Sequence, residues 1–225
     1  MRRISWIQII GASIVVASLA AFAVLLAVSV IERRQAGETA GIEPYMPSAD
    51  ARVSGVAVVY YSRSGNTGLA ARHVARHLQA RLYALNVPNH EIGVGSLVGA
   101  LKAAVALKRD AGALPRTWPK TIDLASFDAV WLGSPVWLYS PASPIWSFVE
   151  NNRFDGKHVV LFNTYNSHIG DEYISAFRDK VMSRGARSFE HRQLLRGRMT
   201  RQLSPEEMLE AIDREWFGIN PDSPL

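Results

Sequence analysis

The chain has 225 residues, with 25 lysines and arginines against 20 acidic residues, and no cysteine. This length allows one domain with an appendage, and the lack of cysteine excludes disulfides, iron–sulfur clusters, thiolate zinc sites and cysteine nucleophiles. The formal charge of +5 arises entirely after residue 50, and six arginines lie between Arg184 and Arg201. These arginines fit either anionic partners or a solvated surface. Because Phe189 is the only aromatic residue among them, we expect no nucleic-acid binding.

The first element is an apolar segment without charges over residues 4–31. A helix needs about 20 apolar residues to cross the ~30 Å hydrocarbon core of a bilayer, whereas the apolar core of a cleaved signal peptide has only ~7–15. We therefore predict a single-pass anchor over residues 1–34, bound to the bilayer through residues 4–31, with a cleaved leader as the alternative. Arginines flank both ends, and Arg52 tips the balance toward a cytoplasmic soluble domain. Residues 35–52 contain several glycines and prolines and are predicted to be a linker.

From residue 53 to the end at 225, short β-rich runs alternate with helical patterns, which predicts one domain with a mostly parallel sheet covered by helices on both faces. The expected strands are residues 56–61, 82–87, 129–132, 159–162 and 187–194. The expected helices are residues 69–79, 96–107, 143–150 and 172–182, and a last helix that begins after Ser204, with Pro205 at its first position and Glu207 completing a capping box. Ligands of such sheets bind at the carboxyl ends of the strands.

The first strand ends in a hydroxyl-rich turn with the sequence Ser62-Arg63-Ser64-Gly65-Asn66-Thr67. A turn that opens a helix offers free backbone N–H groups, hydroxyls and the positive end of a helix dipole, which together suit a phosphate. Gly65 lets the backbone bend close to a ligand. An ordinary helix cap is the alternative, because serine and threonine are also preferred there.

The third strand runs into a second turn with the sequence Gly133-Ser134-Pro135-Val136-Trp137-Leu138-Tyr139-Ser140-Pro141-Ala142-Ser143-Pro144. It lies at the same edge of the predicted sheet as the first turn. Its prolines stiffen the backbone, so its aromatic rings lose little entropy on binding a ligand. A rigid aromatic group beside a phosphate cradle suits a planar ring that carries a phosphate. Taken alone, Trp137 and Tyr139 favour a core or partner-facing position instead.

Together these two turns resemble the flavodoxin family, and the resemblance covers roughly residues 53–217. It implies an α/β fold with a doubly wound, five-stranded parallel sheet in the order 2-1-3-4-5, here preceded by one transmembrane helix. It also implies non-covalent binding of FMN, with the phosphate at the first turn and the isoalloxazine ring against the second. The implied cofactor-binding residues are Ser62, Arg63, Ser64, Gly65, Asn66 and Thr67 in the first turn and Ser134, Pro135, Val136, Trp137 and Tyr139 in the second. Arg63 either adds charge to this site or points into solvent, and we favour solvent.

A third turn, after the fourth strand, usually completes the ring site in this family. Here it reads Asn163-Thr164-Tyr165-Asn166-Ser167-His168, without the glycines that the family often has at this point. The resemblance implies cofactor contacts from Thr164 and Tyr165, with Tyr165 stacking on the flavin. If the acceptor is a quinone, Tyr139, Tyr165 and His168 are the candidate proton donors.

The resemblance implies a flavin-dependent redox function. Flavodoxins that shuttle electrons are typically acidic, whereas this domain is basic and anchored, which favours an oxidoreductase of the NAD(P)H:quinone type acting on a quinone or similar membrane-associated acceptor. The alternatives are an electron carrier for a membrane redox partner and an anchored interaction module without flavin. We expect no metal site, because His73 and His77 are spaced as a metal-binding pair but no third ligand is evident, so a solvated helix face is favoured.

Overall fold

The computed structural model describes residues 6–42, 45, 54–88, 90–110, 112–197 and 201–219. Its helices are α1 (Trp6–Ala40), α2 (Asn66–Leu78), α3 (Val94–Arg109), α4 (Ser143–Asn151), α5 (Asp171–Ser183) and α6 (Pro205–Trp216). Its strands are β1 (Val56–Tyr61), β2 (Arg81–Leu85), β3 (Ala129–Trp137), β4 (Ser140–Pro141), β5 (His158–Tyr165) and β6 (Ser188–Leu195). The predicted elements are all present, with ends that differ by a few residues.

The sheet has the order β2-β1-β3-β5-β6, and these five strands pair in parallel. The two-residue β4 pairs antiparallel with the end of β3 and lies off this path. Without β4 the order is 2-1-3-4-5, so the predicted doubly wound topology is confirmed. The order reverses direction between β1 and β3, which brings the ends of these two strands together at the edge where ligands bind in open α/β sheets.

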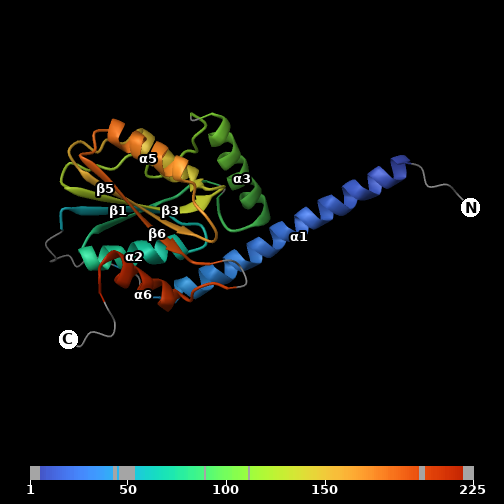
Figure 1. Ribbon diagram of the computed structural model, residues 1–225, viewed down its shortest axis with the longest axis horizontal. Coiled ribbons are helices and arrows are strands. Elements are labelled where there is room, and N and C mark those ends of the chain that lie inside the picture. Colours follow the sequence, from blue (N-terminus) through green and yellow to red (C-terminus); the bar gives the residue numbers. More distant parts are fainter. Residues whose placement is uncertain are drawn as a thin grey trace, which may run out of the picture.

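Helices cover both faces of the sheet, as Figure 1 shows. On one face, α4 and α5 bury Phe148 and Phe177 against a cluster that includes Val59 and Leu132. On the other face, α2 and α6 pack against a second cluster around Phe162. The alternation of side chains along the strands explains this arrangement, because neighbouring residues of β1 point to opposite faces. Ser204 caps α6 through the predicted capping box with Glu207.

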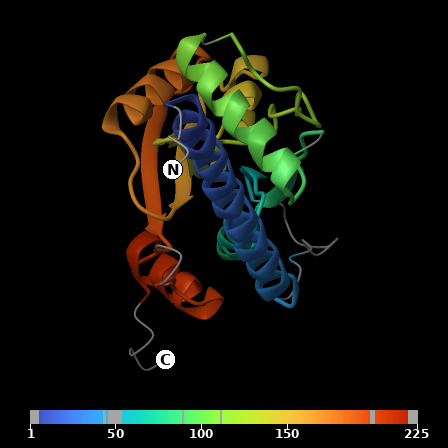
Figure 2. The ribbon, with the colours of Figure 1, turned by 90° about the vertical axis from the view of Figure 1, so that its right-hand side faces the viewer.

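Helix α1 projects far beyond the sheet, and its last turns lie against the domain in contact with α2 and α3 (Figures 1 and 2). Within the described residues it is the one helix long and apolar enough to cross a membrane. It continues through Ala40, six residues into the segment predicted to be a linker. No proline interrupts residues 33–40, and the domain stabilises this end of the helix through Gln35 and Thr39, which are both buried. Residues 43–44 and 46–52 of the expected linker and the expected domain start at residue 53 lie outside the described residues.

Candidate functional site

The first turn connects the end of β1 to α2, as predicted, but the helix begins earlier than expected, at Asn66. Gly65 precedes it with φ +89°, a left-handed conformation that favours glycine. Asn66 and Thr67 therefore belong to the first turn of α2, where backbone N–H groups have no partner within the helix. The positive end of the α2 dipole points toward whatever binds at this turn.

The end of α1 lies directly over this turn. The Gln35 amide oxygen accepts a hydrogen bond of 3.0 Å from the Asn66 side chain, and the Gln35 amide nitrogen donates one of 2.9 Å to Gln202. Thr39 packs so closely on Gly65 that a Cβ placed at residue 65 would lie 2.0 Å from the Thr39 hydroxyl oxygen. Helix α1 is therefore part of the wall of the site, which the linker prediction did not anticipate.

Arg63 is buried, contrary to the solvent-facing position that the sequence favoured. Its side chain is 3% exposed and forms an ion pair of 3.0 Å with Glu32 of α1. One guanidinium nitrogen also donates a hydrogen bond of 3.1 Å to the Gly93 carbonyl. The prediction was wrong because Glu32 comes from a helix that was assigned wholly to the membrane anchor, and a buried arginine needs such a partner.

Arg196 is a second buried arginine at this turn, and it was not predicted to belong to the site. Its guanidinium donates a hydrogen bond to the Asn66 side chain and forms an ion pair of 3.3 Å with Glu38. Burial lowers the pKa of this guanidinium, and the carboxylate of Glu38 opposes that shift. Arg196 lies at the end of β6, the strand beside β5. The basic segment was the only signal for it, and that segment is not a uniform surface, because Arg184 and Arg192 pair with Glu150 and Glu190.

Several buried donors around the first turn have no hydrogen-bond partner in the part of the chain that the structure describes. They are the Ser62 hydroxyl, Nε and one terminal nitrogen of Arg63, and Nε of Arg196. An unpaired buried donor lowers stability by about 1–3 kcal/mol, so several of them close together are unusual in a protein core that binds no ligand. The two guanidinium groups and the helix N-terminus line one cavity and form a donor set that matches a phosphate dianion. The residues present therefore fit the phosphate of FMN.

The second turn is a tight hairpin in which β3 continues to Trp137 and returns through β4. Its two central residues, Leu138 and Tyr139, have φ values of 49° and 72°, which are unusual for residues with side chains. Ser134 is completely buried and supports the hairpin, since its hydroxyl accepts a hydrogen bond of 2.9 Å from the Ala142 backbone. The hairpin thus holds its own shape, and Ser134 supports the site from behind.

Trp137 is held by aromatic neighbours beside this hairpin. Its ring meets Tyr61 edge-on at 5.5 Å between centroids and lies 5.8 Å from the His90 ring. Burial raises the pKa of the Tyr61 hydroxyl, and it lowers the pKa of His90 together with the charge of Arg63. Burial therefore favours the neutral form of both groups beside Trp137.

The third turn lies beside the other two. The Thr164 hydroxyl is 2.7 Å from the Thr67 hydroxyl, so this contact links the end of β5 to the start of α2. Tyr165 and His168 follow at the cavity wall, and the His168 ring lies 6.0 Å from the ring of Tyr139. Burial raises the pKa of Tyr165, and Glu215 adds to this effect.

One cavity of about 410 Å³ joins the three turns and the end of α1, a size typical of cofactor sites. Of the residues predicted to bind the cofactor or donate protons, it is lined by Arg63, Ser64, Asn66, Thr67, Pro135, Val136, Trp137, Tyr139, Thr164, Tyr165 and His168. Ser62 and Gly65 line a neighbouring hollow under α1, and Ser134 lies beneath the second turn. Val28, Ile31, Glu32, Gln35, Leu97, Arg196 and Gln202 complete much of the wall and were not predicted.

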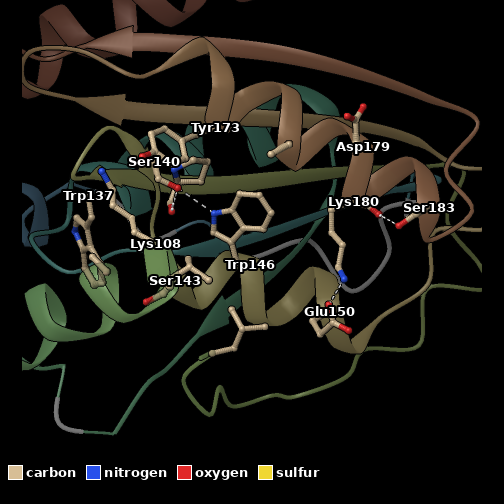
Figure 3. A pocket seen from close by; sticks show the side chains of 15 residues that line it. Lys108, Trp137, Ser140, Ser143, Trp146, Glu150, Tyr173, Asp179, Lys180 and Ser183 are labelled. Carbon is tan, nitrogen blue, oxygen red and sulfur yellow. Dashed lines mark hydrogen bonds and ion pairs between the residues drawn. The ribbon is translucent and has the colours of Figure 1, made fainter. Parts of the chain in front are cut away.

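A second cavity of about 440 Å³ lies among α3, α4 and α5. Figure 3 shows Trp146 at its centre and the ion pair between Lys180 and Glu150 at one end. It contains none of the residues of the first turn, so it is separate from the phosphate donors. Trp137 lines both cavities and therefore stands between them.

The family model for flavodoxin matches residues 55–210 of this chain. The chain belongs to the flavodoxin family. No curated protein matches it. Among solved structures, this flavodoxin-family protein is similar to a flavoprotein from Bacteroides uniformis, with 22% identity and a TM-score of 0.54 over 64% of this chain and 93% of that one. It is also similar to a flavoprotein from Lactobacillus acidophilus solved in complex with FMN, with 20% identity and a TM-score of 0.50 over 60% of this chain and 91% of that one. Likenesses of this order establish the fold.

Proposed function

We propose that this flavodoxin-family protein is a membrane-anchored, FMN-dependent oxidoreductase that reduces a quinone or a similar membrane-associated acceptor. The observation that carries the proposal is the cavity whose wall combines a phosphate-type donor set, an aromatic hairpin and the last turns of a membrane-length helix. FMN would supply the redox chemistry, while the protein provides position, orientation and electrostatics. The FMN complex of the Lactobacillus acidophilus relative supports this choice of cofactor.

In this proposal the phosphate is held by the first turn. Arg63 and Arg196 have unpaired guanidinium nitrogens, and the N-terminus of α2 adds backbone donors. Trp137 and Tyr139 of the second turn would flank the isoalloxazine ring, because both line the same cavity as the phosphate donors. The protein therefore binds the two ends of one flavin with two different turns.

The length of α1 supports an acceptor in the membrane. An apolar segment of 28 residues extends about 42 Å as a helix, which exceeds the hydrocarbon core by about 12 Å. The surplus includes Val28 and Ile31, which line the flavin cavity. The cavity would therefore lie close to the bilayer surface, where a membrane-soluble acceptor is available.

Helix α3 provides a second argument for closeness to the membrane. It contacts α1 and exposes Leu101 and Val105, each 38% accessible to solvent. Lys102 and Arg109 lie on the same helix beside a hollow that also includes Leu25 of α1. Exposed apolar residues flanked by basic ones suit the interface of a bilayer with anionic lipids.

Reduction of a quinone also requires protons. Tyr139, Tyr165 and His168 line the cavity, as required of a donor that meets an acceptor at the flavin. The raised pKa of Tyr165 makes this hydroxyl a poor donor. We therefore propose His168, beside Tyr139, as the group that delivers the proton.

The test uses the full chain purified in detergent. We expect a yellow protein that binds one FMN and oxidises NADH or NADPH when a quinone is the only acceptor, with the turnover number reduced in His168→Ala. Colourless protein that takes up no added FMN would contradict the cofactor and leave the interaction module. A flavin that stays oxidised without a partner protein would instead favour the electron carrier.

We also propose that the domain faces the cytoplasm, on the basis of the arginine count near the apolar segment. Because the chain has no cysteine, a single Asp155→Cys variant offers one label site without background. Asp155 has a side chain that is 61% exposed. A maleimide that cannot cross membranes should label this variant only after the cells are opened, and labelling of intact cells would reverse the orientation.

A further inference from the structure

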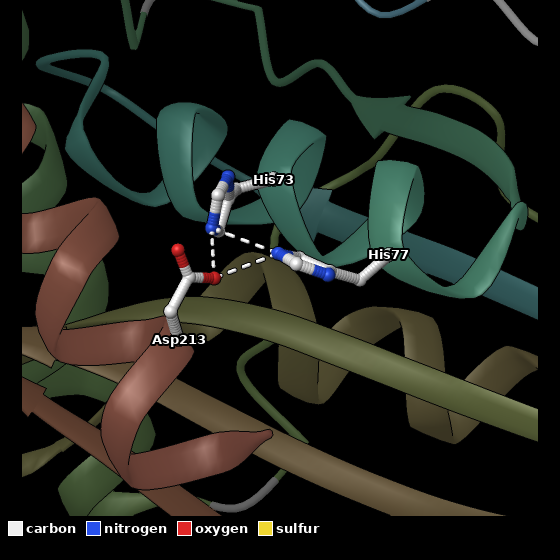
Figure 4. Close-up of side chains that lie close together, drawn as sticks. All are labelled: His73, His77 and Asp213. Atoms are coloured by element: carbon white, nitrogen blue, oxygen red, sulfur yellow. Dashed lines mark hydrogen bonds and ion pairs between the residues drawn. The ribbon is translucent and has the colours of Figure 1, made fainter. Parts of the chain in front are cut away.

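Three potential metal ligands meet between α2 and α6, away from the residues that line the proposed flavin cavity. His73 and His77 are one turn apart on α2, and Asp213 extends toward them from α6, as Figure 4 shows. In the sequence, the two histidines favoured a solvated helix face because no third ligand was evident. The fold supplies that ligand, and His73 is buried with 9% exposure.

The donor atoms converge on one point. Nε2 of His73 and Nε2 of His77 lie 2.6 Å and 2.7 Å from the same carboxylate oxygen of Asp213. The two Nε2 atoms are 3.2 Å apart. A tetrahedral Zn²⁺ with bonds of about 2.0–2.1 Å separates its ligand atoms by about 3.3 Å. The histidine pair already has this spacing, so Asp213 has to withdraw by only about 0.6 Å to admit a cation.

The protons of the cluster point to the same conclusion. Both Nε2 atoms face one oxygen and each other, and the ring tautomers decide which of them donates a proton. A divalent cation would need no proton at this point, because it would bind a lone pair of each of the three atoms. Among the described residues, Nδ1 of His73 has no hydrogen-bond partner, so none of them fixes the tautomer of this ring.

We propose that His73, His77 and Asp213 form a site for a divalent cation of the zinc class that ties α2 to α6. Two imidazoles and one carboxylate, without thiolates, suit Zn²⁺ better than Mg²⁺ or Ca²⁺. The His77 side chain is 27% exposed, so the cation can enter from solvent and keep a water as its fourth ligand. Phe217 stacks on the His77 ring at 4.5 Å between centroids and holds its orientation.

The position of the site indicates a structural role. None of its three residues lines the proposed flavin cavity. Helix α2 begins with Asn66, and α6 follows the segment that carries Arg196, so the two joined helices are those that flank the phosphate donors. A cation here would stabilise the folded chain by binding the native arrangement of both helices.

The test uses the full chain in detergent, freed of metal with a chelator and titrated with Zn²⁺ in a calorimeter. We expect one site per chain, a higher melting temperature with Zn²⁺, and the visible absorbance of tetrahedral Co²⁺ when Co²⁺ replaces it. His77→Ala and Asp213→Asn should each weaken Zn²⁺ binding at least tenfold. His158→Ala, which removes a half-exposed histidine from β5, should leave the affinity unchanged.

Circular dichroism shows whether each variant is folded, and the exposed His77 makes its variant the safer of the two. The proposal is overturned if the unmodified protein binds no Zn²⁺ or if His77→Ala and Asp213→Asn, both folded, bind it as well as His158→Ala does. In that case the cluster is a hydrogen-bonded histidine–aspartate contact. The measurement needs no flavin, so it does not depend on the proposed redox function.

Discussion

The two turns that form the candidate flavin site are held in place in different ways. The first turn relies on a distant part of the chain, because Arg63 and Asn66 find partners in Glu32 and Gln35 of α1. The second turn is held by its own backbone pairing and by the Ser134 hydroxyl beneath it. The phosphate side of the site is therefore coupled to α1, whereas the hairpin on the ring side is held by contacts within the domain.

This difference has a functional consequence. A movement of α1 would change the partners of Arg63 and Asn66 directly, whereas the backbone pairing of the hairpin does not involve α1. Substitutions at the contact between α1 and the first turn should therefore change the affinity for FMN. Substitutions at the hairpin should change the contact with the isoalloxazine ring and leave the packing of α1 as it is.

The largest effect is expected from Gly65→Ala, which places a side chain where φ is +89° and where Thr39 already lies. The left-handed conformation alone costs an alanine about 1–2 kcal/mol, and displacement of α1 adds to this cost. We expect FMN binding, measured by quenching of flavin fluorescence, to weaken by at least about 2 kcal/mol.

Gly156→Ala is the matched control for this change. Gly156 has φ +69° but nothing within 4 Å of a Cβ, so its variant has the same kind of backbone strain without the contact to α1. It should bind FMN normally, and adding Thr39→Ala to Gly65→Ala should recover part of the lost affinity. If the two alanine variants bind FMN equally well, α1 does not pack on the first turn.

Trp137→Ala tests the other turn. Loss of aromatic stacking should weaken FMN binding by about 1–3 kcal/mol while Trp137→Phe retains most of the affinity. Trp118→Ala removes a tryptophan that is 75% exposed and lies outside the cavity, so it serves as the control. An affinity unchanged by Trp137→Ala would show that this ring does not contact the flavin.

Glu32→Gln probes the α1 contact with a smaller change. The carboxylate lines the cavity and takes up part of the charge of Arg63, so its neutral analogue should leave Arg63 freer for a phosphate. We expect FMN to bind several-fold more tightly, most clearly at low ionic strength. Glu210→Gln makes the same change of charge on the exposed side of α6 and should have no effect. Weaker binding in Glu32→Gln would mean that the ion pair positions Arg63.

The smallest expected effect is on the pH dependence of stability, through His90, whose ring lies beside that of Trp137. Burial and the charge of Arg63 lower the pKa of His90 from 6.5, so the unfolded chain takes up this proton first as the pH falls. The stability contributed by the neutral ring is therefore present above about pH 6.5 and declines as the pH falls toward the folded pKa. Urea unfolding between pH 8 and 5 should show a shallower decline in His90→Gln than in the unmodified chain. Equal slopes would show that His90 contributes nothing to this decline.

Much of the site followed from local sequence because strand, turn and helix signals act over a few residues. The order of the strands, the capping box at Ser204 and the meeting of the three turns agree with expectation. The contributions of Arg196 and Asp213 did not follow, since each acts on a residue about 130–140 positions away in the sequence. The sequence does not show whether an arginine in a basic run is buried, because burial requires a partner elsewhere in the chain.

The sequence by itself determined the alternation of strands and helices, the family, the hydroxyl-rich and aromatic turns and the membrane-length apolar segment, because periodicity and turn chemistry are local properties. Only the tertiary structure decided that the end of α1 lies on the first turn, that Arg63 and Arg196 are buried there, and that Asp213 joins His73 and His77. These contacts depend on where the chain brings distant charges together, and a buried charge is stable only beside a partner that local sequence does not reveal.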